Sequence, residues 1–133
     1  MDAFGVHTAY RFRARSHAIA GARRAALTYA RDHAVPADKL DAIALAVSEA
    51  TTNVVMHAYR DRVDPGTFTL DLDLDDSGLV IDVRDDGVGM GPRDDSPGLG
   101  LGLRIIAIVT DAHAFAPADD GGTWLSMRFD RLR

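Results

Sequence analysis

Apolar and polar residues alternate near the start of the chain and then recur at helical spacing. The alternation over residues 8–14 predicts a half-buried strand. Apolar residues next recur every three to four positions over residues 16–33 and again over residues 36–59. This spacing predicts two helices, of which the first can be capped by Ser16. The first part of the chain is therefore expected to form one strand followed by a pair of helices.

The second half of the chain carries mostly strand patterns. Residues 67–74 and 79–83 alternate on either side of a four-residue turn, which predicts an antiparallel hairpin. A stretch rich in glycine and proline follows and predicts a loop. Residues 99–110, which are apolar on almost every side, predict a short buried helix. Two last strands are expected near residues 112–116 and 123–129.

The order of these elements predicts an α+β fold. A strand, two helices, a hairpin, a loop, a helix and two strands can form a two-layer α/β sandwich. In that sandwich the helices cover one face of a mixed, mostly antiparallel sheet. A chain of 133 residues is long enough to bury one sound core, so residues 1–133 are expected to form a single domain.

Composition and charge exclude several classes of function. The chain has no cysteine, which rules out disulfides, thiolate zinc sites and cysteine nucleophiles. A formal net charge of -5 argues against a general nucleic-acid binder, because such proteins usually carry a basic face. No apolar run reaches the length of a signal peptide core or a membrane span. We therefore expect a cytoplasmic protein that binds neither nucleic acid nor a membrane directly.

A polar stripe marks the second predicted helix. Glu49, Asn53 and His57 are spaced four apart, so on an α-helix they lie one above the other beside an apolar face. Polar groups at the edge of a core are well placed to meet a ligand. A stripe of this kind is also what a solvated helix face looks like, so both interpretations stay open at this point.

Two polar residues are predicted on the buried side of strands. Leu79, Ile81 and Val83 face inward, and the period of two makes Asp85 the next inward residue. The same parity places Thr123 on the inward side of the last strand. A buried carboxylate requires a donor, either from the protein or from a ligand. Asp85 could alternatively cap the following turn, and Thr123 could be an ordinary strand residue.

Three glycines precede the last predicted helix. Gly98, Gly100 and Gly102 form a G-x-G-x-G entry, and a glycine-rich helix start exposes backbone N–H groups to anions. The spacing fits neither the dinucleotide fingerprint nor the P-loop. A phosphate cradle of another kind and a flexible loop both remain open. The five histidines show no metal-ligand spacing, and no serine lies in a G-x-S-x-G context.

Taken in order, these stretches resemble the N, G1 and G2 boxes of the histidine-kinase-like (GHKL) ATPase superfamily, whose nucleotide fold is the Bergerat fold. The stretches are residues 47–59, residues 83–90 and residues 98–102. Within the superfamily, the first two are similar to those of small bacterial anti-sigma factor serine/threonine kinases. The resemblance covers nearly the whole chain and implies ATP and Mg²⁺ as cofactors.

The resemblance implies a role for each matching residue. Asn53 matches the asparagine that coordinates the magnesium ion on the ATP phosphates, and Glu49 matches the proposed general base toward a serine or threonine hydroxyl. Asp85 matches the adenine-binding aspartate, and Thr123 matches the threonine that supports adenine recognition. The matching glycines are Gly87 and Gly89 against the base, with Gly98, Gly100 and Gly102 next to the triphosphate.

The same resemblance implies a lid over the nucleotide, formed by residues 86–97. Arg93 in this lid and Arg104, two residues after the second glycine box, are the only cations in residues 86–104, and either could meet the γ-phosphate. His57, with Tyr59, is expected to shape the helix end rather than to touch phosphate.

The resemblance also implies partners. Members of this group bind a sigma factor and phosphorylate an anti-anti-sigma antagonist of the STAS type, and dimerisation is common among them. One alternative is a nucleotide-gated binding module that sequesters a partner with little or no kinase activity. Another is the catalytic domain of a sensor histidine kinase, although no phosphoacceptor helix pair precedes residue 8.

Overall fold

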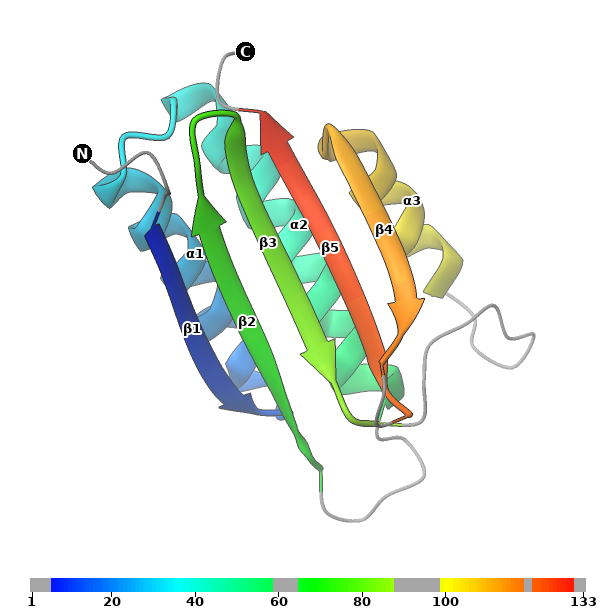
Figure 1. The fold of residues 1–133 in the computed structure, drawn as a ribbon. Helices are drawn as coiled ribbons and strands as arrows, with labels where there is room; N and C mark the ends of the chain where they lie inside the picture. Colours follow the sequence, from blue (N-terminus) through cyan, green and yellow to red (C-terminus); the bar gives the residue numbers. More distant parts are fainter. Residues whose placement is uncertain (1–5, 59–64, 88–98, 119–120, 131–133) are drawn as a thin grey trace.

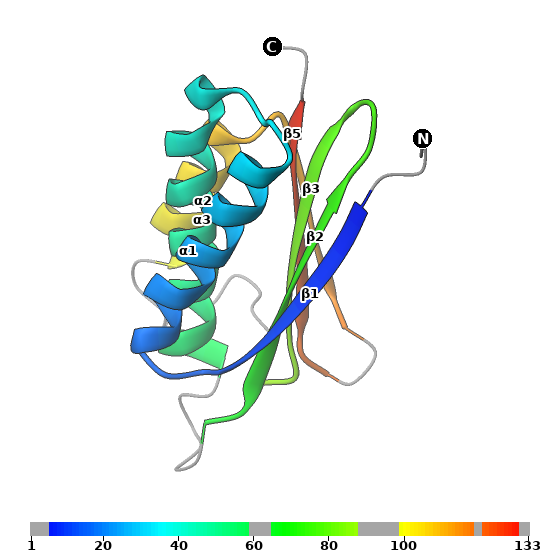
Figure 2. The same cartoon turned by 90° about the vertical axis from the view of Figure 1, so that its left-hand side faces the viewer.

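A five-stranded antiparallel sheet carries helices on one of its two faces (Figures 1 and 2). The computed structural model describes residues 6–58, 65–87, 99–118 and 121–130. The strands lie in the order β1-β2-β3-β5-β4. Their bounds are β1 Val6–Arg13, β2 Thr67–Leu74, β3 Gly78–Asp85, β4 Ala112–Pro117 and β5 Thr123–Asp130, and the α-helices are α1 His17–Asp32, α2 Leu40–Asn53 and α3 Leu99–Val109.

The predicted sandwich is confirmed, but the sheet is not mixed. Every pairing among the described strands is antiparallel. Helices α1 and α2 run in opposite directions between β1 and β2, so the chain returns to the end of the sheet where β1 stopped. Strands β3 and β4 do run in the same direction, but β5 lies between them and pairs with both.

The core lies between the sheet and the helices (Figure 2). Alternate residues of β2 and β3 are buried, as the period of two predicted. Helix α1 faces this layer with small side chains, which allow a close approach to the neighbouring elements. The buried alanines of α1 are Ala18, Ala22, Ala26 and Ala30.

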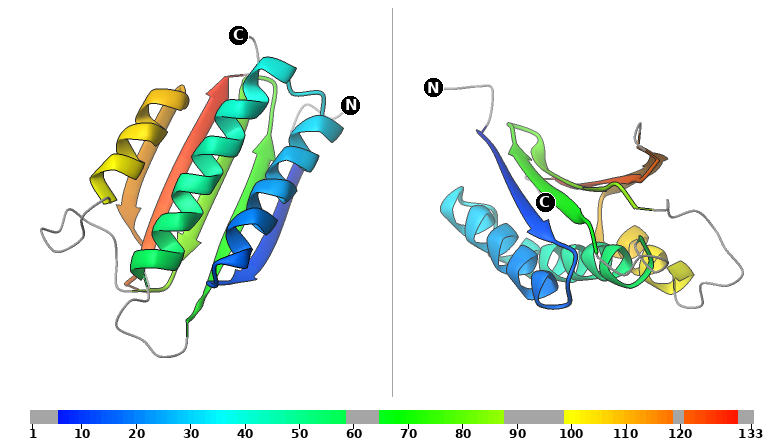
Figure 3. Two further views of the ribbon diagram at one scale, coloured as in Figure 1. Left: turned by 180° about the vertical axis from the view of Figure 1, so that it is seen from behind. Right: turned by 90° about the horizontal axis from the view of Figure 1, so that it is seen from below.

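The last helix differs from its prediction, because one of its sides is exposed. Ile106 is fully buried, whereas Leu101 is 62% exposed and Ile108 is 80% exposed. Helix α3 lies at the side of the helix layer, next to α2 (Figure 3). Packing against α2 covers one side of α3, and an apolar sequence does not itself determine which sides find a partner.

The second predicted helix is three consecutive helical segments. A 3₁₀ turn at Ala37–Lys39 precedes α2, and a π-helical turn at Val54–Ala58 follows it. The hydroxyls of Thr51 and Thr52 bind the carbonyls of Val47 and Ser48 just before this turn, at 2.7 and 2.6 Å. Such back-bonding competes with the helical ladder and commonly bends a helix. The widened turn therefore begins where the ladder is already perturbed.

Helix α1 begins and ends with different local chemistry. Ser16 precedes the helix as predicted, but its side chain makes no capping hydrogen bond. At the other end, the Val35 N–H donates to the Ala30 carbonyl at 2.9 Å, and the Ala34 N–H donates to the Arg31 carbonyl at 3.2 Å. This is a Schellman motif, in which the residue after the cap takes a left-handed conformation. Here that residue is Ala34, with φ of 59°.

Replacing Ala34 by glycine should stabilise the protein. A left-handed alanine costs about 1 kcal/mol or more, whereas glycine adopts this conformation freely. Because glycine also gives the unfolded chain more freedom, we expect a net gain of about 0.5 kcal/mol in the free energy of unfolding. Urea denaturation measures the change. Ala25→Gly, inside α1, is the matched control and should lose about 1 kcal/mol; equal losses in both variants would contradict the prediction.

Candidate functional site

Asp85 and Thr123 lie opposite each other on the two central strands of the sheet. They are cross-strand partners in the β3–β5 pairing, and they are only 3% and 2% exposed. Both face the helix layer, as the parity of their strands predicted. One carboxylate oxygen of Asp85 accepts the N–H of Gly87 at 2.9 Å. Asp85 therefore caps the turn after β3 and is also buried, so the two interpretations of this residue are compatible.

Two glycines hold the backbone segments around Asp85 in close contact. A Cβ atom added to Gly87 would lie 2.2 Å from the carbonyl oxygen of Ala58. A Cβ atom added to Gly122 would lie 1.8 Å from the carbonyl oxygen of Asp85 itself. Neither position has room for a side chain. The end of the π turn, the turn after β3 and the start of β5 are thus packed backbone to backbone.

Helices α2 and α3 bring a carboxylate and an amide together at a second glycine. A Cβ atom added to Gly102 would lie 3.1 Å from Glu49 Oε1 and 3.3 Å from Asn53 Oδ1. Asn53 is 3% exposed, and its side-chain nitrogen Nδ2 has no hydrogen-bond partner among the described residues. A buried N–H without a partner is costly, which marks a position where a bound group can supply the acceptor.

The two groups of residues lie at the same end of the sandwich. Strand β3 ends there, β5 begins there, and α2 and α3 have their facing ends there (Figures 1 and 3). The π turn connects the two groups. It begins directly after Asn53 and ends one turn later at Ala58, which contacts Gly87 beside Asp85. His57, the third residue of the predicted stripe, lies in this π turn and is half-buried.

Some predicted residues of the site lie outside the described part of the chain. They are Gly89, Arg93 and Gly98, together with most of the predicted lid. Gly100 is in the first turn of α3, and Arg104 is exposed on the same helix. Sequence reasoning missed Gly122. The pair Gly121-Gly122 directly before Thr123 was the available signal, but a close approach to Asp85 cannot be inferred without knowing that β5 lies beside β3.

The residues present suit a magnesium ion that is carried by a nucleotide. Among the described residues, no group of three or more His, Cys, Asp or Glu side chains is arranged to hold a metal ion. Mg²⁺ usually takes one or two protein oxygens and completes its shell with phosphates and water. The Oδ1 atom of Asn53 beside Gly102 is an oxygen of this kind, and the missing side chain of Gly102 lets the start of α3 lie close to it.

Comparison of the sequence with known protein families identifies the family of this chain. The sequence profile described as Histidine kinase-like ATPase domain matches residues 12–129. The chain belongs to this family. The described fold is consistent with it, and membership implies that the domain binds a nucleotide. The matched span contains every residue discussed for the site.

Solved structures show the same fold at low sequence identity. One match is a chain from the crystal structure of the SiaB–SiaC complex of Pseudomonas aeruginosa. The identity is 14%, the TM-score is 0.67, and the match covers 96% of this chain and 90% of the other. Among curated protein sequences there is no significant match. In the part of the chain that the structure describes, no helix is long and apolar enough to cross a membrane.

Gly122→Ala should impair nucleotide binding more than Gly121→Ala. The added methyl group of the first variant must displace the Asp85 backbone, whereas a Cβ on Gly121 meets nothing within 4 Å. Gly121 has φ of 93°, so its replacement strains the turn and costs about 1 kcal/mol of stability without moving Asp85. Isothermal titration with ATP and thermal unfolding separate the two effects. Equal nucleotide affinities in the two variants would show that the contact does not position Asp85.

Proposed function

We propose that the protein is an ATP-dependent serine/threonine protein kinase that acts as an anti-sigma factor. The observation that carries the proposal is the contact of Glu49 and Asn53 with Gly102 at the start of α3. It places a carboxylate, a buried amide and a glycine-rich helix start around one small space. These are the groups that phosphoryl transfer requires, since that reaction depends mainly on positioning and charge neutralisation.

The adenine would be bound at the ends of β3 and β5. Asp85 and Thr123 supply a carboxylate and a hydroxyl on the inner side of the sheet, both within the buried layer. A carboxylate there can accept a hydrogen bond from the exocyclic amino group of adenine, directly or through water. The contact of Gly87 with Ala58 would then set the floor against which the base lies.

The phosphates would lie toward α2 and α3. Asn53 would bind the magnesium ion through Oδ1, and the N–H groups at the start of α3 would face the phosphate oxygens. Gly102 lets the start of α3 approach Glu49 and Asn53 closely, because a side chain at this position would crowd both of them. The proposal also includes residues implied by the family resemblance. Gly89 would lie against the adenine, Gly98 would lie next to the triphosphate, and Arg93 or Arg104 would meet the γ-phosphate.

Glu49 would act as the general base. A serine or threonine hydroxyl of the substrate protein attacks the γ-phosphorus and a new O–P bond forms. The bond from the γ-phosphorus to the bridging oxygen breaks, and ADP leaves with that electron pair. The hydroxyl proton passes to the Glu49 carboxylate, which lies one helical turn from Asn53 and is partly exposed. A base in this position can reach both the nucleotide and an incoming protein.

The proposed partners are a sigma factor and a STAS-type antagonist, and the proposed location is the cytoplasm. The support is the similarity of the first two stretches, residues 47–59 and 83–90, to those of anti-sigma factor kinases. The solved chain with the same fold was crystallised in a complex of SiaB with SiaC, which is consistent with a domain that works through a protein partner. We further propose that residues 1–133 form one domain.

Asp85→Asn should weaken ATP binding. The substitution removes the charged acceptor for the adenine amino group, and a hydrogen bond to a charged group typically supports about 10- to 100-fold in affinity. Isothermal titration of the folded variant with Mg-ATP measures the loss. Asp73→Asn, at an exposed position on the other face of the sheet, is the control and should bind normally. Unchanged affinity in Asp85→Asn would show that the adenine does not bind there.

Glu49→Gln should retain ATP binding and lose phosphoryl transfer. Glutamine keeps the shape of the side chain but cannot accept the proton, so transfer should fall about 10²- to 10⁴-fold. The assay mixes the purified protein with labelled Mg-ATP and candidate STAS-type antagonists. Asp41→Asn, an exposed residue on the same helix, is the control.

Two outcomes of that assay would change the assignment. Transfer that is unaffected by Glu49→Gln or Glu49→Ala would exclude Glu49 as the base. ATP binding by the native chain, without transfer to any antagonist, would favour the nucleotide-gated binding module instead of a kinase.

A further inference from the structure

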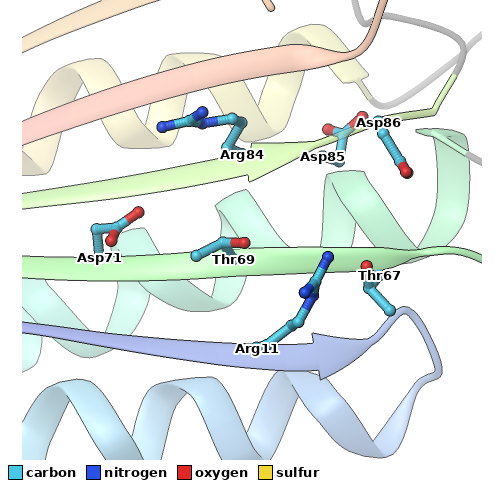
Figure 4. Close-up of a pocket in the computed structure, with 7 residues that line it drawn as sticks. All are labelled: Arg11, Thr67, Thr69, Asp71, Arg84, Asp85 and Asp86. Carbon is cyan, nitrogen blue, oxygen red and sulfur yellow. The ribbon is translucent and has the colours of Figure 1, made fainter. Parts of the chain in front are cut away.

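The sheet has a second face, which no described element covers. All three α-helices lie on the opposite side (Figure 2). We call the uncovered side the outer face; it faces the viewer in Figure 1. A shallow cavity of about 330 Å³ lies on this face, over the neighbouring strands β1, β2 and β3 (Figure 4). Its volume is at the lower end of the range for small-molecule sites.

Two arginines line the cavity from the strands on either side of β2. The strand register aligns Arg11 of β1 and Arg84 of β3 with Thr69, which lies between them. Because neighbouring strands are about 4.8 Å apart, the backbones of the two arginines are about 10 Å apart. The Arg11 side chain reaches over β2 toward Thr67 and Thr69, whereas the Arg84 side chain extends along β3 away from Arg11 (Figure 4). The cavity therefore has two separate cationic groups with Thr69 between them.

Trp124 holds Arg84 in place without using its hydrogen-bond donors. The guanidinium carbon of Arg84 lies 4.8 Å from the centre of the indole ring. This attraction comes from the ring quadrupole, so it leaves the N–H groups of Arg84 without an acceptor. Among the described residues, neither Arg84 nor Arg11 has a carboxylate partner. The donors of both arginines are therefore available to a ligand.

The carboxylates that line the cavity are already engaged. Asp71 binds His7 at 3.1 Å, and Asp86 has an interaction partner of its own. Asp85 directs its carboxylate to the helix layer, where it accepts the Gly87 N–H. The charge in the cavity that lacks a partner is therefore positive, although the net charge of the whole chain is -5.

We propose that the cavity binds a small dianion, which is a molecule with two anionic groups such as a dicarboxylate or a diphosphate. One anionic group would accept hydrogen bonds from Arg11 and from the Thr69 hydroxyl. The other would accept hydrogen bonds from Arg84. The planar guanidinium fork matches the oxygens of both carboxylate and phosphate, so the two kinds of dianion share the chemistry that this site recognises.

Other classes of ligand fit the cavity less well. A cation would be repelled by the two arginines, and an apolar ligand would cover their N–H groups without supplying acceptors. A single small anion would meet one guanidinium only, because the two side chains point apart (Figure 4). Asp82 also faces the outer side, but it is not among the residues that line the cavity.

The dianion site does not rest on the proposed kinase activity. Glu49, Asn53 and Gly102 lie among the helices, on the other side of the sheet. The two proposals can therefore fail independently, because binding of a dianion is measured without nucleotide, magnesium or substrate protein.

Titration of the native chain with two probes tests the site. Pyrophosphate and succinate, in magnesium-free buffer, represent the two kinds of dianion. At least one should bind with a dissociation constant of about 1 mM or below by isothermal titration, and the stronger of the two identifies the preferred anionic group. Acetate, which has one anionic group, should bind at least tenfold more weakly. Trp124 is the only tryptophan of the chain, so its fluorescence should change during the same titrations.

Substitution of either arginine should weaken binding of the preferred probe. Arg11→Gln and Arg84→Gln each remove one charged donor group, so each should raise the dissociation constant about 10- to 100-fold. Arg24→Gln removes an exposed charge from helix α1 and is the matched control, which should bind normally. Asn53→Ala, altered at the candidate nucleotide site, should also bind the probe normally. Circular dichroism establishes that each variant is folded.

Removal of a carboxylate from the cavity should have the opposite effect. Asp71→Asn eliminates a negative charge that repels the ligand, so the preferred probe should bind about two- to fivefold more tightly. Weaker binding in this variant would show that the ligand is held through a cationic group, which would contradict the proposal.

Several outcomes would overturn the proposal. They are the absence of saturable binding of either probe, unchanged affinity in both folded arginine variants, or saturable binding without a change in tryptophan fluorescence. Binding that is lost in Asn53→Ala but kept in the arginine variants would place the probe at the nucleotide site. Binding of a protein, but of neither probe, that is lost in Arg84→Gln would assign the two arginines to a protein contact instead.

Discussion

Backbone contact without intervening side chains determines how the helix layer meets the sheet at the candidate site. Gly87 lies against the carbonyl of Ala58, and Gly122 lies against the carbonyl of Asp85. A buried carboxylate is expensive unless donors surround it, and backbone N–H groups are the closest donors available. Gly87 supplies one such group, because its N–H donates to the Asp85 carboxylate at 2.9 Å. The relation of Asp85 to Asn53 follows from the same contact, since one helix carries both Asn53 and Ala58.

Much of this arrangement could be predicted from periodicity alone. In β3 and β5 the side chains alternate between two environments, so a polar residue that continues an apolar series must face the same way as that series. Asp85 and Thr123 were placed on the buried side by this reasoning, and both are buried there. The hairpin of β2 and β3 was predicted for the same reason, but its turn is one residue shorter than predicted, because Gly78 already belongs to β3.

Other features depend on packing that the sequence pattern does not contain. An α-helical N–H bonds the carbonyl four residues earlier, whereas a π-helical N–H bonds the carbonyl five residues earlier. Residues 54–58 have the π-helical pattern, and their last residue, Ala58, packs against Gly87 in the segment after β3. The exposure of Leu101 and Ile108 likewise reflects where α3 lies at the side of the helix layer. Whether the sheet is mixed depends on which strands are neighbours. Strand β5 lies between the parallel strands β3 and β4, and this order is set by tertiary packing rather than by the pattern of any one strand.

The alternation of the central strand has a consequence for how the protein can change. In β3 the odd-numbered residues build the core and end in Asp85, whereas Asp82 and Arg84 face the other side. A substitution at one of these outward positions alters which surface the molecule presents but leaves the packing behind the strand in place. The surface and the core of the molecule can therefore change separately within the same eight residues.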